Sequence, residues 1–267
     1  MIRLTKYIVT FAAAAIMSSP AFAQIDYFED FEGLSIDDPA ALTDAGWLVF
    51  ATVWNDYPGC NASYAYNYGV FGAPNGGPGF SSIKGGDSGQ VLNAYSDYNN
   101  GDHNNGLCIE TSLFQERGLT AADAGTYAFM FNTQVALDDD GQPIALGPDV
   151  VTNGFVKLLD PNNGYATVWS DTISTSAAGA KSISLVLDAA ADGLLIQWGF
   201  ATRASNYEAT GRWYDDVSFA LEGTYEPPTG PSPVKYDGIP IPRWALLIMA
   251  GLLMYFGRTK LLARKET

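Results

Sequence analysis

Hydrophobic and polar residues alternate with a period of two along the middle of the chain. In the segment 126–137 the large apolar side chains fall on one side of an extended strand, and they are Tyr127, Phe129, Phe131, Val135 and Leu137. Two later runs repeat the pattern, one with Ile183, Leu185 and Leu187 and one with Leu194, Ile196, Trp198 and Phe200. A period of two is typical of strands that bury one face, so this region is predicted to form β-sheet.

Turn-forming residues separate these runs. Clusters of Gly, Asn, Asp and Pro occupy 72–79, 99–106, 138–141 and 160–164. Short strands divided by such clusters predict an all-β fold, an antiparallel β-sandwich formed by one domain. The only helical turns expected in it lie near 40–45 and 120–124, and the segment 138–153 is expected to be a hairpin excursion from the core.

Both ends of the chain carry segments unlike the rest. Arg3 and Lys6 precede an apolar run and the sequence Ala-Phe-Ala at 21–23, which predicts a secretory signal peptide over 1–23. At the other end, a Pro-rich linker at 223–238 leads to an apolar stretch, 239–257, followed by basic residues. That stretch approaches the length needed to span a bilayer, and its basic flank places the C-terminus in the cytoplasm. The predicted parts are therefore a signal peptide (1–23), a sandwich (24–222), a linker (223–238) and a transmembrane tail (239–267).

The exported body is strongly acidic. Residues 24–238 contain 28 Asp and Glu against seven Lys and Arg, a net charge of −21. Nucleic acid is not expected as a partner, because a phosphate backbone requires a basic surface. Such a charge suits divalent cations, although acidity that serves only solubility is an equally open interpretation.

The chain has two cysteines, Cys60 and Cys108. Thiols exported to an oxidising compartment pair more often than they bind metal or do chemistry, so a disulfide between them is expected.

Residues suited to catalysis are few. The single histidine, His103, lies in the polar cluster 99–106 and is expected to be solvated. No nucleophile elbow, phosphate-binding loop or zinc-protease motif occurs, and we do not expect an enzyme. A pair of carboxylates acting on a glycosidic bond stays open, since their separation is spatial.

One carboxylate is predicted to face the core. In the segment 213–221, a period of two places Asp215 on the same side as Val217 and Phe219. A buried carboxylate is costly unless a cation or several hydrogen-bond donors compensate it.

Two short motifs resemble a group of calcium-binding jelly-roll modules. They are Asp30-Phe31-Glu32 with Gly46-Trp47, and Asp215-Asp216-Val217-Ser218-Phe219. MAM-type domains, choice-of-anchor J-type surface domains and several carbohydrate-binding modules belong to this group. The resemblance implies a jelly roll whose first and last strands lie side by side and hold one structural Ca²⁺. It implies Glu32 and Asp215 as ligands, with Asp30 and Asp216 in reserve; in the alternative, these acids cap turns or face solvent.

Aromatic residues gather in the segment 54–71. The candidates for stacking on sugar rings are Trp54, Tyr57, Tyr64, Tyr66 and Tyr68. The last three alternate with smaller residues, so the sequence predicts that they project from one side of a strand. The alternative is a core strand whose hydroxyl groups reach the edge.

The tail resembles the C-terminal sorting signals of Gram-negative bacteria, of the PEP-CTERM and IPTL-CTERM types. The residues that carry the resemblance are Ile239, Pro240, Ile241, Pro242 and Trp244, followed by Leu, Ala and Gly. Ile-Pro-Arg stands where Thr-Leu-Ser is usual in the second type. The resemblance implies an exosortase-type membrane transpeptidase as a partner, which would cut near the Pro motif. A plain single-pass anchor is the alternative.

Together these features predict an exported, non-enzymatic bacterial surface protein. The expected β-sandwich is calcium-stabilised and binds polysaccharide or serves as an adhesive component, anchored in the cell envelope by its tail with the domain outside the cytoplasm, or released to the extracellular matrix. A secreted glycoside hydrolase or lyase is the first alternative. A structural matrix protein without a specific ligand is the second.

Overall fold

The computed structural model describes residues 24–56, 60, 63–77, 79–86 and 89–224. The predicted signal peptide, nearly all of the predicted linker, the tail with its sorting motif, and Tyr57 lie outside these residues. Within the part that is described, no helix is long and apolar enough to cross a membrane.

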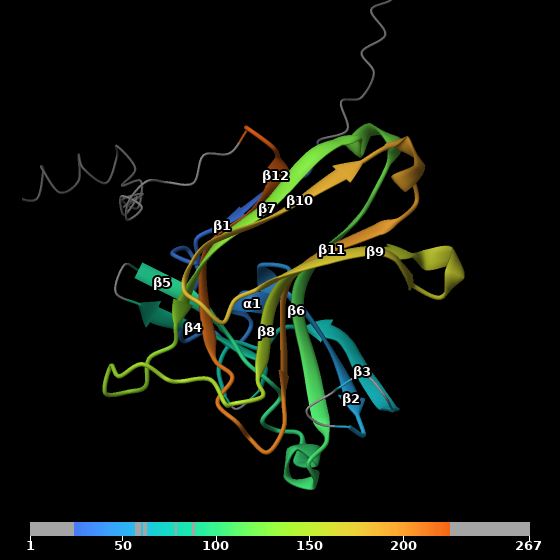
Figure 1. The fold of residues 1–267 in the computed structure, drawn as a ribbon. Helices are drawn as coiled ribbons and strands as arrows, with labels where there is room; N and C mark the ends of the chain where they lie inside the picture. Colours follow the sequence, from blue (N-terminus) through green and yellow to red (C-terminus); the bar gives the residue numbers. More distant parts are fainter. Residues whose placement is uncertain (1–23, 57–59, 61–62, 78, 87–88, 225–267) are drawn as a thin grey trace, which may run out of the picture. The chain divides into compact units, whose positions relative to one another are not determined.

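Twelve strands in the described residues form two antiparallel sheets that face each other (Figure 1). Sheet A contains β1 (Asp26–Glu29), β4 (Ser81–Gly86), β5 (Gly89–Ala94), β7 (Gly125–Val135), β10 (Gly179–Leu187) and β12 (Arg212–Leu221). Sheet B contains β2 (Leu48–Trp54), β3 (Tyr64–Gly72), β6 (Cys108–Gly118), β8 (Val151–Asp160), β9 (Ala166–Ser174) and β11 (Leu195–Ala204). The predicted all-β antiparallel sandwich is confirmed.

The strand order is β10-β7-β12-β5-β4 in sheet A, where β1 also pairs with β12, and β3-β2-β6-β11-β8-β9 in sheet B. The chain crosses repeatedly between the sheets, since β5, β7, β10 and β12 belong to one sheet and β6, β8, β9 and β11 to the other. The first and last strands are neighbours, as the resemblance to jelly-roll modules implied. The narrower jelly-roll class stays a prediction.

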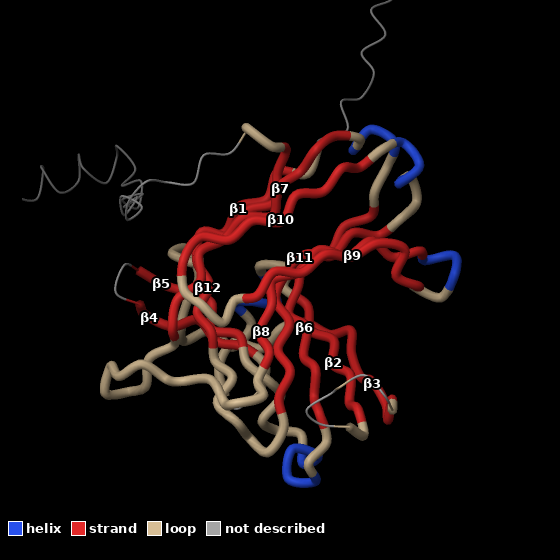
Figure 2. The backbone as a smooth tube through the Cα atoms, viewed as in Figure 1, coloured by secondary structure: helices blue, strands red, loops and turns tan. Residues whose placement is uncertain are grey.

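Helical segments are short and lie outside the sheets (Figure 2). They are α1 (Ala41–Asp44) and the 3₁₀ turns η1 (Gly101–Asn105), η2 (Ala121–Asp123), η3 (Pro161–Asn163) and η4 (Ala189–Ala191). The turns expected near 40–45 and 120–124 are therefore present as α1 and η2. Part of the expected hairpin excursion is present too, because Ile144 N donates to Ala136 O and Asp138 N to Gln142 O.

The core lies between the sheets and follows the period-two pattern. The predicted inward residues of β7, β10 and β11 are buried, apart from the half-buried Val135, and Leu194 just before β11 is half-buried too. Leu137, beyond the end of β7, packs instead in a separate cluster with Trp213, so its predicted position on the inward face is wrong. Trp47 is fully buried and stacks on Phe200, which in turn stacks on Tyr214 with ring centroids 3.6 Å apart. Because Phe200 belongs to sheet B and Tyr214 to sheet A, this stack joins the two layers.

A β-bulge in β12 corrects the predicted alternation around Asp215. Against β7, Asp215 pairs with Asn132 but Ser218 pairs with Met130, so β12 carries one extra residue. Asp216 has a positive φ of 50°, and the bulge reverses the phase of the strand. Tyr214 and Val217 consequently both enter the core, while Asp215 is only half-buried. The expectation that Asp215 shares the inward face with Val217 is therefore wrong.

The predicted disulfide joins Cys60 to Cys108 with Cα atoms 5.5 Å apart. It ties the connection between β2 and β3 to the first residue of β6. A structural disulfide is typical of an oxidising compartment, and it indicates an extracytoplasmic protein.

Removing this cross-link should destabilise the sandwich. The cysteines are 48 residues apart in sequence, so the bond restricts a large loop of the unfolded chain. We expect the double substitution Cys60→Ala/Cys108→Ala to lower the free energy of unfolding by about 3 kcal/mol, measured by urea denaturation. Wild-type protein under reducing conditions should show the same loss, and an unchanged midpoint in both would contradict this role.

Candidate functional site

Acidic side chains meet where β12 changes partners. On one side, β12 pairs with β5 through Tyr214 and then with β1 from Val217 onward. Asp215 and Asp216 occupy the gap between these two pairings. The turn after β1 brings Asp30 and Glu32 to the same seam, which we call the acidic junction (Asp30, Glu32, Asp215 and Asp216).

Backbone and side-chain hydrogen bonds fix one wall of this junction. Glu32 accepts a hydrogen bond from Gln90 N at 2.6 Å, and Gln90 Nε2 donates to Glu32 O at 3.0 Å. Gly89 allows this approach, since a Cβ there would overlap the Glu32 carboxylate. Between the flanking acids, Phe31 takes a positive φ of 60° and turns its ring fully into the core. In the sequence Asp30-Phe31-Glu32, the Phe31 ring therefore packs in the core, while the two carboxylates lie at the surface.

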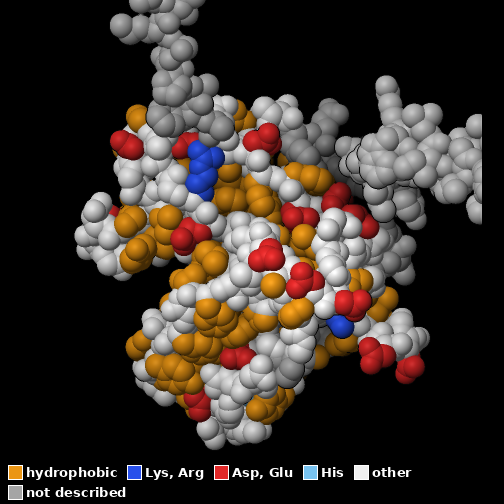
Figure 3. All heavy atoms as spheres, turned by 180° about the vertical axis from the view of Figure 1, so that it is seen from behind, with side chains coloured by type: hydrophobic (Ala, Val, Ile, Leu, Met, Phe, Trp, Pro, Cys, Tyr) orange, Lys and Arg blue, Asp and Glu red, His pale blue; other side chains and the backbone are white. Residues whose placement is uncertain are grey.

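The acidic junction is electrostatically uncompensated. Burial, followed by the negative charge of Asp216, raises the pKa of Asp215 to about 6, and Glu32 and Asp30 act in the same direction. Burial also raises the pKa of Asp216, although Asn132 Nδ2 donates a hydrogen bond to its carboxylate at 2.8 Å. The two ion pairs formed by the described residues lie elsewhere. Acidic side chains outnumber basic ones across the face shown in Figure 3 as well.

The donor set of the acidic junction suits a hard cation, because every candidate ligand is an oxygen. In this structure, the carboxylate oxygens of the acidic junction do not form a coordination shell. Within the described ranges, no group of three or more His, Cys, Asp or Glu side chains is arranged so that it could hold a metal ion. Calcium binding would therefore require carboxylates to rotate inward or backbone carbonyl and amide oxygens to contribute.

The predicted tyrosine platform is divided between the two faces of sheet B. Tyr66 and Tyr68 pair with Val53 and Ala51, whose side chains are buried toward sheet A. A bulge at Ala65 then shifts the register, so that Tyr64 pairs with Trp54 and their rings contact edge to face at 6.2 Å. Cross-strand partners share a face, so Tyr64 and Trp54 lie opposite to Tyr66 and Tyr68. The expectation of three tyrosines on one side is wrong.

Tyr66 and Tyr68 are held by a polar loop. The Tyr66 hydroxyl donates to Asp102 at 2.6 Å, and the Tyr68 hydroxyl donates to Asp97 at 2.7 Å. Asn100 Nδ2 donates to both hydroxyl oxygens. The hydrogen bond from Tyr66 lowers the pKa of Asp102. These hydroxyl groups already have partners within the fold, which favours the structural interpretation for this pair.

His103 is buried, and the expectation of a solvated histidine is wrong. Its side chain is fully covered, its Nε2 lies 3.1 Å from Ser96 Oγ, and its ring stacks on Tyr207. Burial lowers the pKa of His103, so the neutral ring is favoured. Ser96 is also fully buried, and neither side chain can reach a substrate in solution. The Ser-His contact is therefore a structural one.

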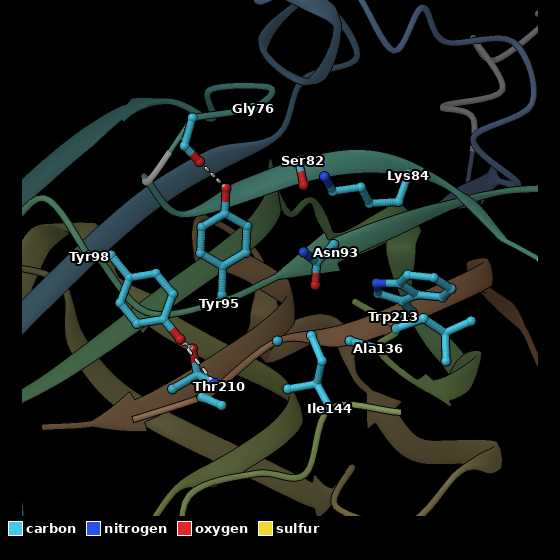
Figure 4. Close-up of a pocket in the computed structure, with 14 residues that line it drawn as sticks. Gly76, Ser82, Lys84, Asn93, Tyr95, Tyr98, Ala136, Ile144, Thr210 and Trp213 are labelled. Atoms are coloured by element: carbon cyan, nitrogen blue, oxygen red, sulfur yellow. Dashed lines mark hydrogen bonds between the residues drawn. The ribbon is translucent and has the colours of Figure 1, made fainter. Parts of the chain in front are cut away.

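A pocket of about 310 Å³ lies on the face of sheet A that points away from sheet B (Figure 4). Its floor is a row of cross-strand partners, in which Ser82 pairs with Asn93 and Asn93 pairs with Trp213. Lys84 follows Ser82 by two residues on β4 and therefore shares its face. The intervening residues Ile83 and Leu92 point into the core. Sheet A therefore has an apolar inner face at these strands and an outer face that carries both polar and apolar side chains.

The pocket walls come from loops. Ala136, Leu137 and Ile144 form an apolar wall and pack with Trp213 in a small cluster. The opposite wall contains Tyr95 and Tyr98, whose rings stack at 5.7 Å. Hydrogen bonds hold both rings in place, because Tyr95 donates to Gly77 O at 2.6 Å and Tyr98 donates to Glu208 O at 2.9 Å.

The combination of apolar rings with a few converging polar groups is typical of small-ligand sites. Sequence reasoning missed this pocket, because its residues come from 76–98, 136–144 and 209–213 and no single stretch resembles a binding motif. One signal was available in the sequence. Ser82 and Lys84 flank Ile83 on β4, and Asn93 follows Leu92 on β5, as expected for a sheet with polar residues on its outer face.

A scan against protein-family profiles finds no match, and neither does a search of curated protein sequences. Among solved structures, the sandwich is similar to several carbohydrate-binding modules. One is the structure of a family 61 module in complex with β-1,4-galactotriose (14% identity, 53% of this chain and 82% of that chain, TM-score 0.32). Another is a family 4 module (15% identity, 72% and 96%, TM-score 0.34). A third is a family 22 xylan-binding domain from Paenibacillus barcinonensis (14% identity, 73% and 98%, TM-score 0.35). These values are too low to carry an argument about a ligand.

The acidic junction should destabilise the metal-free protein at neutral pH. The folded-state pKa of Asp215, about 6, exceeds the usual value of 3.8, so the charged form is disfavoured in the folded state and stability falls as the pH rises from about 4 to 6. In EDTA at pH 7.5, Asp215→Asn should therefore raise the free energy of unfolding by about 1 kcal/mol, after allowance for solvent screening at this half-buried site.

The gain in the free energy of unfolding from Asp215→Asn should shrink below pH 4, where wild-type Asp215 is already protonated. Asp139→Asn in an exposed turn is the matched control and should have no effect at either pH. Urea denaturation of both variants at the two pH values measures the difference. A loss of stability in Asp215→Asn at pH 7.5 would contradict the electrostatic account.

Proposed function

We propose that this protein is an exported bacterial surface protein whose β-sandwich binds glycan without chemical turnover. The observation that carries the proposal is the pocket over β4, β5 and β12, in which Ser82, Lys84 and Asn93 lie in the floor beside Trp213 and next to the apolar wall. Sugars present both hydroxyl groups and apolar C–H faces, so a site of this composition suits them.

The same pocket favours binding over hydrolysis. Hydrolysis of a glycosidic bond commonly needs two carboxyl groups that flank it. None of the residues that line the pocket is Asp or Glu. The alternative of a glycoside hydrolase or lyase would therefore need a different site, and a structural matrix protein without ligand would leave the pocket unexplained.

We propose Ca²⁺ as a structural ion at the acidic junction. The raised pKa of Asp215 and its coupling to Asp216, Glu32 and Asp30 support this assignment, because a bound cation would offset their mutual repulsion. Glu32 and Asp215 are the first candidates for ligands. Bound there, the ion would fasten the turn after β1 to the β12 bulge.

We further propose that the tail determines location. In this proposal the signal peptide exports the chain, and the apolar segment 239–257 holds it in the membrane with the sandwich outside. An exosortase-type transpeptidase then acts at the motif around Ile239 and Pro242, and it releases or re-anchors the sandwich.

Glycan binding is tested by an oligosaccharide array followed by calorimetry, with product analysis of each mixture. We expect Asn93→Ala to weaken binding about fivefold, since it removes one hydrogen-bonding group from the pocket. Asn67→Ala on the exposed edge strand β3 is the matched control and should bind like the wild type. Equal binding by both variants, combined with loss in Tyr64→Ala, would instead place the site at the aromatic segment. Release of new reducing ends would overturn the non-enzymatic assignment.

Calcium binding is tested by thermal unfolding. At pH 7.5 we expect 1 mM Ca²⁺ to raise the wild-type Tm by roughly 5 °C over the value in EDTA, because an ion that binds only the folded state stabilises it. Asp215→Ala should abolish the response, and Asp171→Ala on the exposed strand β9 should keep it. The response should also fade below pH 6, where protons compete for Asp215. Identical wild-type curves with and without Ca²⁺ would contradict the assignment.

A further inference from the structure

The charge of the pocket differs from that of the body around it. Six Lys and Arg residues occur between positions 24 and 224, and Lys84 is one of them. It is the only charged residue among those that line the pocket, which contain no acid. Arg117 and Arg203 already pair with Asp123 and Glu110, whereas Lys84 has no such partner among the described residues. A free ammonium group therefore faces an uncharged pocket within a strongly acidic domain.

A second polar group in the pocket lacks a partner. Asn93 Oδ1 is buried and accepts no hydrogen bond from the described residues. A buried acceptor without a donor costs free energy, and a ligand that supplies an O–H or N–H group would recover it. The adjacent Gly211 leaves room for this oxygen, which lies 3.1 Å from the position that a Cβ there would take.

The polar groups converge on one part of the pocket. Figure 4 shows the amine end of Lys84 near Ser82 and Asn93, between the rings of Tyr95 and Trp213. A ligand that fits this arrangement carries an anionic group for Lys84, a hydroxyl donor close to it for Asn93, and an apolar face toward Trp213 and Ile144.

We propose that the pocket binds a uronate unit of an acidic polysaccharide. The uronate carboxylate lies against the Lys84 ammonium, a neighbouring ring hydroxyl donates to Asn93 Oδ1, and the C–H face of the ring packs on the apolar wall. This inference rests on the proposed glycan-binding function and narrows it to a class of sugar. The net negative charge of the body opposes the contact only in part, because exposed charges more than about 8 Å apart are largely screened at physiological salt.

The test compares two ligands with the same sugar ring, one with a free carboxylate and one in which that group is a neutral methyl ester. Oligogalacturonate and its fully methyl-esterified form share every ring hydroxyl, but the ester has no negative charge. Each is titrated by calorimetry into the full chain, purified in detergent, in 0.15 M salt. EDTA is present throughout, so that a calcium ion cannot bridge a carboxylate to the acidic junction.

We expect the wild-type chain to bind the acid about tenfold more tightly than the ester, the size of one hydrogen bond to a charged group. Lys84→Gln should remove this preference and leave affinity for the ester unchanged. Lys181→Gln on β10 is the matched control and should keep the preference. Lys84 is exposed, so its substitution leaves the core intact.

The outcomes separate this inference from the proposed function. Equal affinity for acid and ester, or a preference that survives Lys84→Gln, would overturn the uronate assignment while glycan binding stands. Binding of a sulfated oligosaccharide in preference to the uronate would also overturn it. Failure of every neutral and acidic oligosaccharide to bind would overturn the glycan-binding function itself.

Discussion

The arrangement of sheet A depends on β12, which pairs along the same edge first with β5 and then with β1. Its first three residues pair with β5, and the four residues from Val217 to Ala220 pair with β1. The bulge at Asp215 and Asp216 accommodates the change. Because of the bulge, Tyr214 reaches the core on one side of the seam and Val217 on the other. Without it, an unbroken period of two would place these residues on opposite faces, and either Tyr214 or the pair Val217 and Phe219 would lose its place in the core.

This single strand also organises both polar regions of the molecule. Trp213 points away from the core and forms the end of the pocket floor, while Asp215 and Asp216 supply half of the acidic junction. The pocket and the junction share β5 as well, since Asn93 lies in the pocket and Gln90 is bonded to Glu32. The four residues 213–216 therefore contribute to the pocket, to core packing and to the acidic junction.

Local patterns predicted the fold better than they predicted the site. Alternating residues such as Phe129, Ile183 and Trp198 fall inside the core because a strand has only two faces. The same rule failed at Asp215 and Tyr64, where a bulge adds one residue and reverses the faces; nothing in the sequence marks the extra residue. Contacts between residues far apart in the sequence cannot be predicted from local patterns of this kind. His103 is buried by Tyr98 and Tyr207, and the pocket unites β4, β12 and a distant loop, so neither was visible in any single stretch.

The position of β12 also bears on mechanics. It is the last strand of the sandwich, and it lies within sheet A with neighbours on both sides. A force applied at the C-terminal end of the domain therefore enters an interior strand and not an edge. Since the ladder hydrogen bonds run perpendicular to the strands, pulling along β12 loads many of them in shear at once, against β7 on one side and against β1 and β5 on the other. A strand held in this way resists extraction far better than one that can be unzipped bond by bond.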